Sequence, residues 1–427
     1  MNTIIQQNQE KKKIVILGAG FGGLRAAAQI GKAIMAHKLE DKYEVVIVER
    51  NDHHTYTPLL YEVATTLADT VTAPRLHEVA TFNIKSIFAR LSVTPLRDNI
   101  MGIDLEKSVI QLELGGALIF DHLIITLGSE TNDFGIPGLH EHSLPLKTFG
   151  DAIRIRDRIA DLMTSGEKDV DQIKILVGGA GSTGVEIAGE LKMLGFSVEL
   201  IEATPGILPG FDERVRSKVM RRLAKIGVMI STGQSIKEVS KHTLALASGE
   251  IKPFDLFVWT GGIKPSSLIQ TMPIKTELHK RAEITGEMCA TPISPDLMLR
   301  SHIYVLGDAA CFMDPKTGKA IPSVARAAID EADIASWNLV QEILAELKAA
   351  PAPTYRHYVP QEYPYIIPIG GKYAIAKVGS IIISGFFGWV LKGFVELNYI
   401  LSLMPLRKAL KIWLKGLWIF VQNDRLG

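Results

Sequence analysis

The sequence predicts an α/β fold of two similar parallel-sheet domains, followed by a helical C-terminal segment. Two of the observations behind this prediction are alike: short apolar strands lead into glycine-rich turns at residues 14–23 and again at residues 175–184. The third is the apolar and basic character of residues 370–427, where eight basic side chains outnumber two acidic ones. With 427 residues, of which 47% are hydrophobic, the chain can form two or three domains with sizeable cores.

The first glycine-rich turn follows the strand 14–17 and carries the spacing Gly18-x-Gly20-x-x-Gly23. The first glycine permits a tight turn, the second lets a pyrophosphate approach the backbone, and the third lets the next helix pack against the sheet. That helix points its N-terminal N–H groups at the phosphates. The next strand ends in Glu49, whose carboxylate can accept hydrogen bonds from both ribose hydroxyls. These residues predict a Rossmann-like dinucleotide-binding domain.

The second turn repeats this plan with Gly179, Gly181 and Gly184, and we expect a helix over residues 186–194. The strand that follows ends in Glu202. A carboxylate there repels a 2′-phosphate, so this site favours NADH over NADPH. A chain with two such domains can hold two nucleotides face to face, so that electrons pass between them.

Composition excludes several classes of protein. The formal net charge of +1 shows no nucleic-acid footprint, so we expect no nucleic-acid partner. The two cysteines, Cys289 and Cys311, have neither paired spacing nor a metal-ligand pattern, so we expect no metal. Residues 1–13 are polar and then basic and lead directly into the first strand, so we expect no signal peptide and a cytoplasmic catalytic body.

The order of strands predicts that one domain interrupts the other. Residues 1–122 and 290–348 form the first domain, and residues 123–289 form the second with its connecting segments. Buried strands are expected within 121–128, 254–259 and 301–308, and a helix over 150–165. Residues 349–427 form a linker, rich in Pro and Tyr up to residue 368, and then the C-terminal segment.

The C-terminal segment is expected to be helical. Residues 378–391 contain no charge, but Lys392 and Glu396 come too early for a spanning helix, which needs about 20 apolar residues. In the last part of the chain, Leu and Trp residues alternate with Arg and Lys residues, as in an amphipathic helix that lies in a membrane interface. We therefore expect residues 375–427 to contact a membrane surface, with a core-covering helix or a homodimer contact as the alternative. The side chains concerned are Leu406, Arg407, Lys408, Leu410, Lys411, Trp413, Leu414, Lys415, Leu417 and Trp418.

Several segments in order resemble the type II NADH dehydrogenases, the single-subunit, non-proton-pumping NADH:quinone oxidoreductases. They are residues 18–23, 56–64, 179–191, 259–262 and 304–310, together with the Trp- and Lys-bearing tail. The glycine-rich turns belong to the wider two-dinucleotide-binding flavoprotein architecture. The Pro-Leu-Leu-Tyr-Glu-Val segment at 58–63 and the tail are more specific to this family.

The resemblance implies a non-covalent FAD in the first domain. The three glycines of the first turn would hold its pyrophosphate, and Glu49 the adenosine ribose. Asp308 would reach the ribityl chain or a phosphate, although it is also suited to capping a helix before Ala309. The FAD-binding set that the resemblance implies is Gly18, Gly20, Gly23, Glu49, Thr57, Pro58, Leu59, Leu60, Gly128, Asp308 and Ala325. Within it, residues 57–60 would flank the isoalloxazine and Gly128 the adenosine side.

The resemblance also implies that NADH binds the second domain and reduces the flavin by direct hydride transfer. The protein stacks the two rings and excludes water, so no side-chain nucleophile is needed. The implied NADH-binding set is Gly179, Gly181, Gly184, Glu202, Gly261 and Gly262, the last two giving nicotinamide access to the flavin.

Glu186 and Arg326 are the candidate catalytic side chains. The family's glutamate at the position of Glu186 is tied to proton delivery or quinone handling; complementing a helix dipole is the alternative, and Glu190 is expected to be structural. The family usually has Ala-Gln where this chain has Ala325 and Arg326. The arginine therefore leaves the identity of the electron acceptor open. A guanidinium near the flavin would stabilise the reduced, anionic ring, and a surface salt bridge is the alternative.

Other flavoproteins of this architecture are the rival hypotheses. Disulfide reductases need a Cys-x4-Cys pair and sulfide:quinone oxidoreductases need reactive cysteines, and neither pattern is present. A ferredoxin or rubredoxin reductase, an NADH oxidase, and a non-catalytic FAD- and NADH-sensing protein stay open. We expect a peripheral protein on the cytoplasmic face of the cell membrane that passes electrons from NADH to a membrane quinone in a respiratory chain. Which quinone it uses and whether oxygen or another protein competes as acceptor stay open too.

Overall fold

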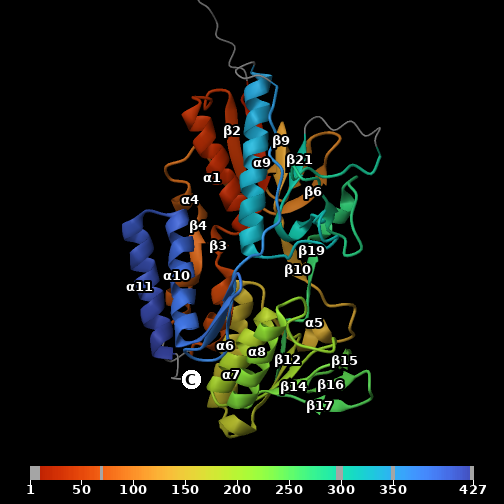
Figure 1. Cartoon of the computed structure of the whole chain (residues 1–427), viewed down its shortest axis with the longest axis vertical. Coiled ribbons are helices and arrows are strands. Elements are labelled where there is room, and N and C mark those ends of the chain that lie inside the picture. Colours follow the sequence, from red (N-terminus) through yellow and green to blue (C-terminus); the bar gives the residue numbers. More distant parts are fainter. Residues whose placement is uncertain (1–9, 68–70, 295–301, 348–351, 424–427) are drawn as a thin grey trace, which may run out of the picture. The chain divides into compact units, whose positions relative to one another are not determined.

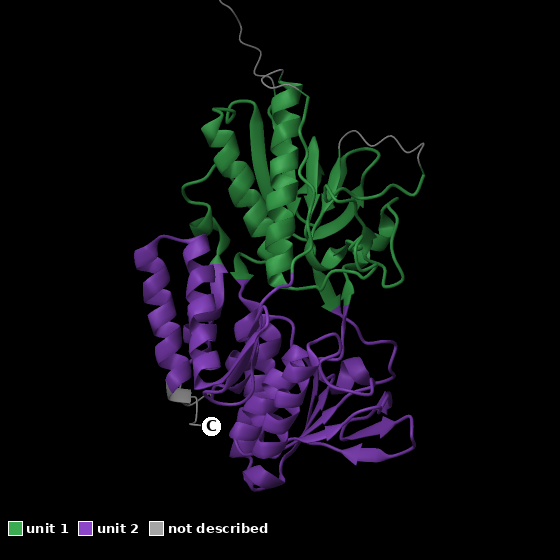
Figure 2. Ribbon diagram, viewed as in Figure 1, with its two compact units in different colours: residues 1–54, 83–130, 264–361 green, residues 55–82, 131–263, 362–427 purple. Residues whose placement is uncertain are grey.

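The computed structural model describes residues 10–67, 71–294, 302–347 and 352–423. The chain divides into two compact units, shown in different colours in Figure 2. Unit 1 comprises residues 1–54, 83–130 and 264–361, and unit 2 comprises residues 55–82, 131–263 and 362–427. Each unit contains one glycine-rich turn. Residues 55–82 and the tail fall in the unit of the second turn, and the boundaries of the functional domains stay a prediction.

Unit 1 is built on a parallel sheet of the kind that the sequence predicts. Its strand order is β21–β9–β1–β2–β5. The central strand β1 is apolar, and its residues 14–17 are fully buried, as expected for a parallel strand covered on both faces. Helices α1 and α9 pack against each other alongside this sheet (Figure 1). The bounds are β1 Lys12–Leu17, α1 Phe21–Ala36, β2 Tyr43–Glu49, β5 Thr94–Arg97, β9 His122–Ile125, β21 Ile303–Val305 and α9 Ala325–Glu346.

Smaller elements complete unit 1. An antiparallel sheet has the order β6–β7–β8, and β20 pairs with β22. The expected strand over 301–308 is confirmed as β21 and runs into a short 3-10 turn, while Ser301 lies outside the described residues. The bounds are α4 Ile84–Ile87, β6 Ile100–Asp104, β7 Val109–Leu112, β8 Gly116–Ile119, η3 Ser267–Thr271, β20 Ala282–Glu283, η4 Gly307–Ala309 and β22 Ala310–Cys311.

Unit 2 repeats the parallel sheet with the order β11–β18–β12–β13–β14. A second sheet, β15–β16–β17, packs over it through a core that includes Leu176, Val239, Leu244 and Phe257. The predicted helix near 150–165 is α6. At its N-terminus, Thr148 and Asp151 form a capping box, in which each side chain accepts a hydrogen bond from the backbone N–H of the other residue. The bounds are β11 Leu144–Pro145, α6 Phe149–Thr164, η2 Val170–Gln172, β12 Lys174–Gly178, α7 Ser182–Met193, β13 Ser197–Ile201, α8 Glu213–Ile226, β14 Met229–Ser231, β15 Ile236–Val239, β16 Thr243–Leu246, β17 Ile251–Pro253 and β18 Leu256–Trp259.

The remaining short elements precede these sheets or lie where the chain passes from one unit to the other. The α7 helix begins at Ser182, four residues earlier than the expected start at Glu186. The bounds are β3 His53–Thr55, η1 Thr57–Leu59, α2 Leu60–Thr65, α3 Ala73–Ala80, β4 Thr81–Asn83, β10 Ser129–Thr131, α5 Leu139–His142 and β19 Ile263–Pro265.

The C-terminal segment corrects the prediction of a helix from residue 378. Residues 365–385 form an antiparallel sheet of β23 Tyr365–Pro368, β24 Ala374–Val378 and β25 Ile381–Gly385, and helix begins only at Phe386. Gly379, with φ +54°, forms the turn between β24 and β25, and three consecutive isoleucines then favour a strand. The expected linker to residue 368 therefore includes β23; its residues 349–351 lie outside the described part of the chain.

Two adjacent helices complete the tail, α10 Phe386–Leu403 and α11 Leu406–Asn423, and the amphipathic helix predicted near the end of the chain is thereby confirmed (Figure 1). Both helices have exposed large apolar side chains, the most exposed being Phe387 at 75%. Within the described residues, α10 is long and apolar enough to cross a membrane by length and composition alone. This differs from the expectation that Lys392 and Glu396 come too early for a spanning helix. The last four residues, 424–427, lie outside the described part.

The tail sheet is bound to the nucleotide-domain helices of unit 2. Arg222 on α8 donates to the carbonyls of Ile369 at 3.2 Å and Gly370 at 2.9 Å, and its guanidinium lies 4.5 Å from the centroid of the Tyr373 ring. The Glu190 carboxylate on α7 accepts from the Gly371 N–H at 3.4 Å, which supports its expected structural role. The tail is therefore part of the fold of unit 2.

Replacing Arg222 tests this attachment. An Arg222→Lys variant keeps the charge but loses the planar fork that reaches two carbonyls. We expect a loss of about 1–3 kcal/mol in the free energy of unfolding, because a buried hydrogen-bonded contact is broken. Arg221→Lys is the matched control, since Arg221 is the exposed neighbour on the same helix. Equal denaturant midpoints for the two variants would contradict the attachment.

Candidate functional site

The first glycine-rich turn needs its outer glycines for internal packing. Gly18 has φ +95°, and a Cβ there would lie 2.5 Å from the carbonyl oxygen of Thr126. A Cβ at Gly23 would lie 2.0 Å from the carbonyl oxygen of Gly18. In contrast, a Cβ at Gly20 would meet no protein atom within 4 Å. The middle glycine thus leaves open space beside the backbone, which fits a closely approaching pyrophosphate.

The second turn has the same construction. Gly179 has φ +94° and lies against Gly261, while a Cβ at Gly184 would lie 1.9 Å from the Gly179 carbonyl oxygen. A Cβ at Gly181 would again meet nothing within 4 Å. Each turn leads directly into a helix, α1 after Gly20 and α7 after Gly181, with no side-chain cap. Both turns therefore fit a dinucleotide phosphate at a helix N-terminus.

Two threonines that sequence reasoning missed fix these turns. The Thr126 hydroxyl lies 2.8 Å from the Leu17 carbonyl oxygen and 2.9 Å from that of Gly18. The Thr260 hydroxyl lies 2.9 Å from the carbonyl oxygens of both Gly178 and Gly179. Each threonine directly follows a parallel strand next to the turn and precedes a glycine by two residues. That repeated Thr-x-Gly pattern was a signal available in the sequence.

The two acidic side chains at the strand ends bind their own turns. The Glu49 carboxylate accepts from the Ala19 N–H at 2.9 Å and from the Asn51 N–H at 3.1 Å. The Glu202 carboxylate accepts from the Ala180 N–H at 2.7 Å and from the Thr204 N–H at 2.8 Å. Because an ionised carboxylate has about four lone-pair sites, each retains acceptors for ribose hydroxyls. Their predicted contacts with the nucleotides stay a prediction.

Buried polar groups surround the first turn. The His54 ring nitrogen Nδ1 lies 2.9 Å from the Ala19 carbonyl oxygen and donates to it, while burial lowers the pKa of His54 to about 4, so the ring is neutral. The Glu331 carboxylate accepts from the Gly307 N–H at 2.6 Å, and burial raises the pKa of Glu331 to about 8. Sequence reasoning missed both residues, since neither has a motif spacing.

Asp308 lies inside the short turn η4, whose N-cap is Leu306, so the alternative that it caps a helix before Ala309 is wrong. Its carboxylate accepts from the Ser129 hydroxyl at 2.6 Å. Gly128, with φ +63°, would place a Cβ in open space. Asp308 and Gly128 both belong to unit 1, as do the first turn and Ala325, the first residue of α9.

The remaining residues predicted to contact FAD or NADH differ in how far they are buried or packed. Thr57 and Pro58 are exposed at the start of η1, whereas Leu59 and Leu60 are buried. A Cβ at Gly261 would lie 2.2 Å from the Trp259 ring, and one at Gly262 would lie 2.9 Å from the Phe134 ring. Packing inside unit 2 thus explains both glycines, and their roles toward nicotinamide stay a prediction.

Glu186 is not a helix-dipole residue. It is the fifth residue of α7, which has no acidic residue in its first turn. Withdrawal from water raises the pKa of Glu186 to about 8, with a smaller raising effect from Glu62 and a lowering one from Lys392. The side chain therefore holds a proton near neutral pH, as a proton-delivering group requires.

Arg326 lies at the second position of α9 with an exposed side chain. Its guanidinium pairs with Asp330 at 2.9 Å, one turn along the same helix. This contact is the surface salt bridge that the sequence left open as the alternative to a flavin contact. A catalytic role for Arg326 stays a prediction.

Neither cysteine has the environment of a redox-active thiol. Burial raises the pKa of Cys289 to about 12 and also raises that of Cys311, so both are protonated at neutral pH. Both are free thiols. Within the described ranges, no cluster of His, Cys, Asp and Glu side chains is suited to a metal ion.

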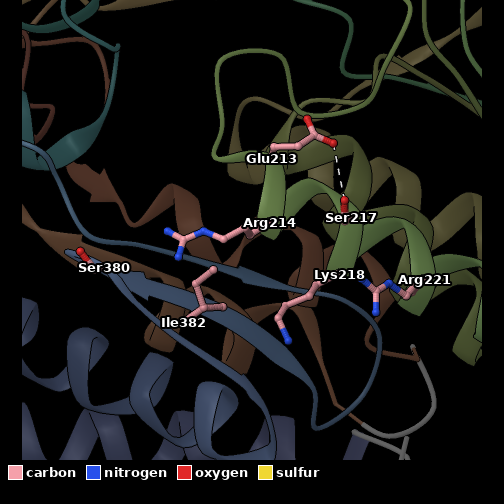
Figure 3. A pocket seen from close by; sticks show the side chains of 7 residues that line it. All are labelled: Glu213, Arg214, Ser217, Lys218, Arg221, Ser380 and Ile382. Carbon is pink, nitrogen blue, oxygen red and sulfur yellow. Dashed lines mark hydrogen bonds between the residues drawn. The ribbon is translucent and has the colours of Figure 1, made fainter.

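In unit 2, a surface groove of about 480 Å³ lies between α8 and the β24–β25 hairpin (Figure 3). Arg214, Lys218 and Arg221 line it, and the Ser217 hydroxyl donates to Glu213 at 3.5 Å. None of the sequence-predicted site residues lines it, so it is distinct from the candidate nucleotide sites.

The family of the chain follows from a family model. Residues 12–332 match the model described as pyridine nucleotide-disulphide oxidoreductase. This chain belongs to that family. The match extends over both glycine-rich turns and ends within α9, so it covers the two parallel sheets whose geometry is described above.

Relatives of known name place this member of the family more closely. The type II NADH:quinone oxidoreductase Ndh of Mycobacterium tuberculosis is 26% identical over 95% of this chain and 88% of that protein. The demethylphylloquinone reductase NdbB of Synechocystis is 27% identical over 87% of this chain and 86% of that protein. The fold is shared with the structure of NDH2 from Plasmodium falciparum in complex with NADH, at a TM-score of 0.79 and 18% identity over 98% of this chain and 100% of that chain. These matches confirm the resemblance to type II NADH dehydrogenases that the sequence predicts.

Alanine substitutions separate the packing role of a glycine from its role toward a nucleotide. We expect Gly181→Ala to fold with an unchanged melting temperature, because its φ of −69° suits alanine and the added methyl meets no protein atom. We expect its KM for NADH to rise, since the methyl occupies space beside the phosphates.

Gly184→Ala is the contrasting variant, because its methyl would overlap the backbone. We expect it to lower the melting temperature. Differential scanning fluorimetry and NADH titration check the pair. An unchanged KM for a well-folded Gly181→Ala would count against a nucleotide at the second turn.

Proposed function

We propose that this protein oxidises NADH with FAD as its cofactor and reduces a membrane quinone, without pumping protons, as an entry point of a respiratory chain. The observation that carries the proposal is the duplicated glycine-rich turn, each with an open middle glycine and an acid bound to the turn. The named relatives support the same donor and acceptor classes.

In this proposal, Gly18, Gly20, Gly23 and Glu49 at the first turn would hold FAD, which would supply the hydride-accepting and electron-transfer chemistry. The chain's own residues bind and orient. Gly20 and Gly181 admit the pyrophosphates, and Glu49 and Glu202 hold both the turns and the ribose hydroxyls. Because Glu202 is negative and buried beside its turn, it disfavours a 2′-phosphate and selects NADH over NADPH.

The quinone-reducing step needs a proton from the protein or the solvent. The balanced overall reaction is NADH + H⁺ + quinone → NAD⁺ + quinol, so each turnover consumes one proton. Glu186 is suited to supply it, since its raised pKa keeps the carboxyl protonated near pH 7. This assignment gives Glu186 the proton-delivering role that the family resemblance implies.

The C-terminal helices are the proposed membrane contact of a peripheral protein on the cytoplasmic face. Large apolar side chains on both helices are exposed, while the basic residues Arg407, Lys408 and Lys411 are exposed on α11. Aromatic and cationic side chains together favour an interface with anionic lipid. The exposed apolar residues of α10 and α11 are Phe386, Phe387, Phe394, Val395, Leu401, Leu406, Leu414 and Trp418.

The decisive experiment compares the rates of NADH oxidation with different electron acceptors. Purified protein should be yellow, release FAD on boiling, and oxidise NADH with a ubiquinone or menaquinone analogue at rates well above those with ferredoxin or oxygen as the single acceptor. A colourless preparation, or one that prefers ferredoxin or oxygen, would overturn the proposal. If the protein reduced ferricyanide efficiently but not quinone, its NADH-oxidising activity would be supported, but quinone as its electron acceptor would be refuted.

Substitutions on the exposed face test the membrane contact better than truncation, because removing residues 375–427 would also remove the buried strand β24. We expect Phe387→Gln combined with Trp418→Gln to lower partitioning onto anionic vesicles by roughly tenfold or more, since two exposed aromatic side chains that would enter the lipid interface are lost. Leu278→Gln is the control, because Leu278 is 87% exposed in unit 1. Vesicle sedimentation measures the effect, and equal partitioning of both variants would contradict this contact.

A further inference from the structure

Unit 2 contains an ion pair that influences Glu186, the candidate proton donor. Lys392 on α10 forms an ion pair with the Glu62 carboxylate of α2, through the oxygen Oε1. The Tyr61 hydroxyl donates to the same oxygen at 2.9 Å, and the Lys392 ammonium lies 5.2 Å from the centroid of the Tyr61 ring. Glu62 is only 6% exposed. This ion pair lies within electrostatic reach of Glu186.

The other oxygen of Glu62 is not satisfied. Among the described residues, Oε2 of Glu62 is one of the few buried side-chain atoms with no hydrogen-bond partner. A buried acceptor without a donor is costly, and such atoms are typical of functional sites. The lone pair of Oε2 is therefore available to a protonated neighbour.

Glu396 is the neighbour that the reaction described above does not use. It lies one turn after Lys392 on α10, is 8% exposed, and interacts electrostatically with both Lys392 and Glu62. Tyr56, beside α2, also faces Glu396 and stacks on Tyr399 with ring centroids 5.0 Å apart. From α11, Gly416 packs closely, since a Cβ there would lie 3.7 Å from Glu396 Oε1.

The two glutamates are influenced by the same ion pair. Glu186 on α7 and Glu396 on α10 are both influenced by Lys392 and by Glu62. Burial raises the pKa of Glu396 to about 7 and that of Glu186 to about 8. Near neutral pH a substantial share of both carboxyls is therefore protonated, while the Glu62 carboxylate is paired with Lys392.

We propose that Glu396 is a second proton-holding residue of the quinone-reducing reaction, coupled to Glu186 through the Lys392–Glu62 ion pair. This inference rests on the proposed function. Each turnover consumes one proton. When Glu186 gives up its proton, a proton from Glu396 replaces it by way of the free Oε2 of Glu62, and Glu396 then takes a proton from water. No electron moves in this transfer, and the only bonds made or broken are O–H bonds.

The Glu396→Gln variant tests the proposal through the pH profile of quinone reduction. Glutamine matches the neutral acid in shape but carries no transferable proton. Below pH 7, where wild-type Glu396 is protonated, we expect the variant's kcat to be lower by about three- to tenfold. Above that pH the wild-type carboxyl has lost its proton, so the two rates should converge. Glu396→Asp should restore a titrating step, and Glu238→Gln, on the exposed strand β15, should leave the profile unchanged.

Infrared difference spectroscopy of the purified protein gives a readout independent of turnover. In wild type, the carbonyl band of protonated carboxyls should lose a component as the pH is raised through about 7. That component should be missing from Glu396→Gln and retained in Glu238→Gln.

Identical pH profiles and identical infrared titrations for wild type and Glu396→Gln would overturn the inference. A wild-type protein that reduces no quinone would refute the proposed function instead. In both cases the flavin content and the ferricyanide rate confirm that each variant is folded and loaded.

Discussion

The close approach between each glycine-rich turn and the strand beside it is the constraint on which both nucleotide domains depend. In each unit a threonine hydroxyl, Thr126 or Thr260, contacts two carbonyl oxygens of the turn. The outer glycines have no room for a Cβ, whereas a Cβ at the middle glycine would meet no protein atom within 4 Å. The carboxylate at the end of the next strand completes the arrangement by binding an N–H of the turn. The protein therefore builds the same turn twice, from matching Gly, Thr and Glu residues, and each turn leads into a helix N-terminus.

Much of this could be predicted from the sequence, because glycine spacing and apolar strands are local signals. The strands, the two turns and the amphipathic α11 follow from patterns within about 20 residues. The supporting groups could not be predicted in this way. His54 and Glu331 act across unit 1 without a motif, and the Lys392–Glu62 pair joins residues that are 330 positions apart. Such contacts depend on tertiary packing, which periodicity does not encode.

The tail shows where a compositional signal misleads. The charge-free run at 378–391 contains a β-hairpin followed by the start of a helix, because Gly379 turns the chain and the isoleucines favour extended backbone. Arg222 and Glu190 then fasten the hairpin region to α8 and α7. The segment that composition predicts to contact a membrane surface is also an integral part of unit 2, and the buried strand β24 contributes to its core.

Because the tail is part of unit 2, helix α10 carries both exposed apolar side chains and largely buried ionisable ones. On α10, Phe394 and Val395 are exposed at 57% and 50%, whereas Glu396 is 8% exposed and Lys392 is paired with Glu62. An α-helix is about 10 Å in diameter with its side chains, so an apolar molecule bound to the exposed face of α10 lies within about one helix diameter of the buried carboxyls. A lipid-soluble acceptor at that face would lie close to Glu396, the residue proposed above to hold a proton. The same geometry explains why ionisable side chains are tolerated in so apolar a helix: Lys392 is paired with the Glu62 carboxylate, and burial raises the pKa of Glu396, which favours its neutral form.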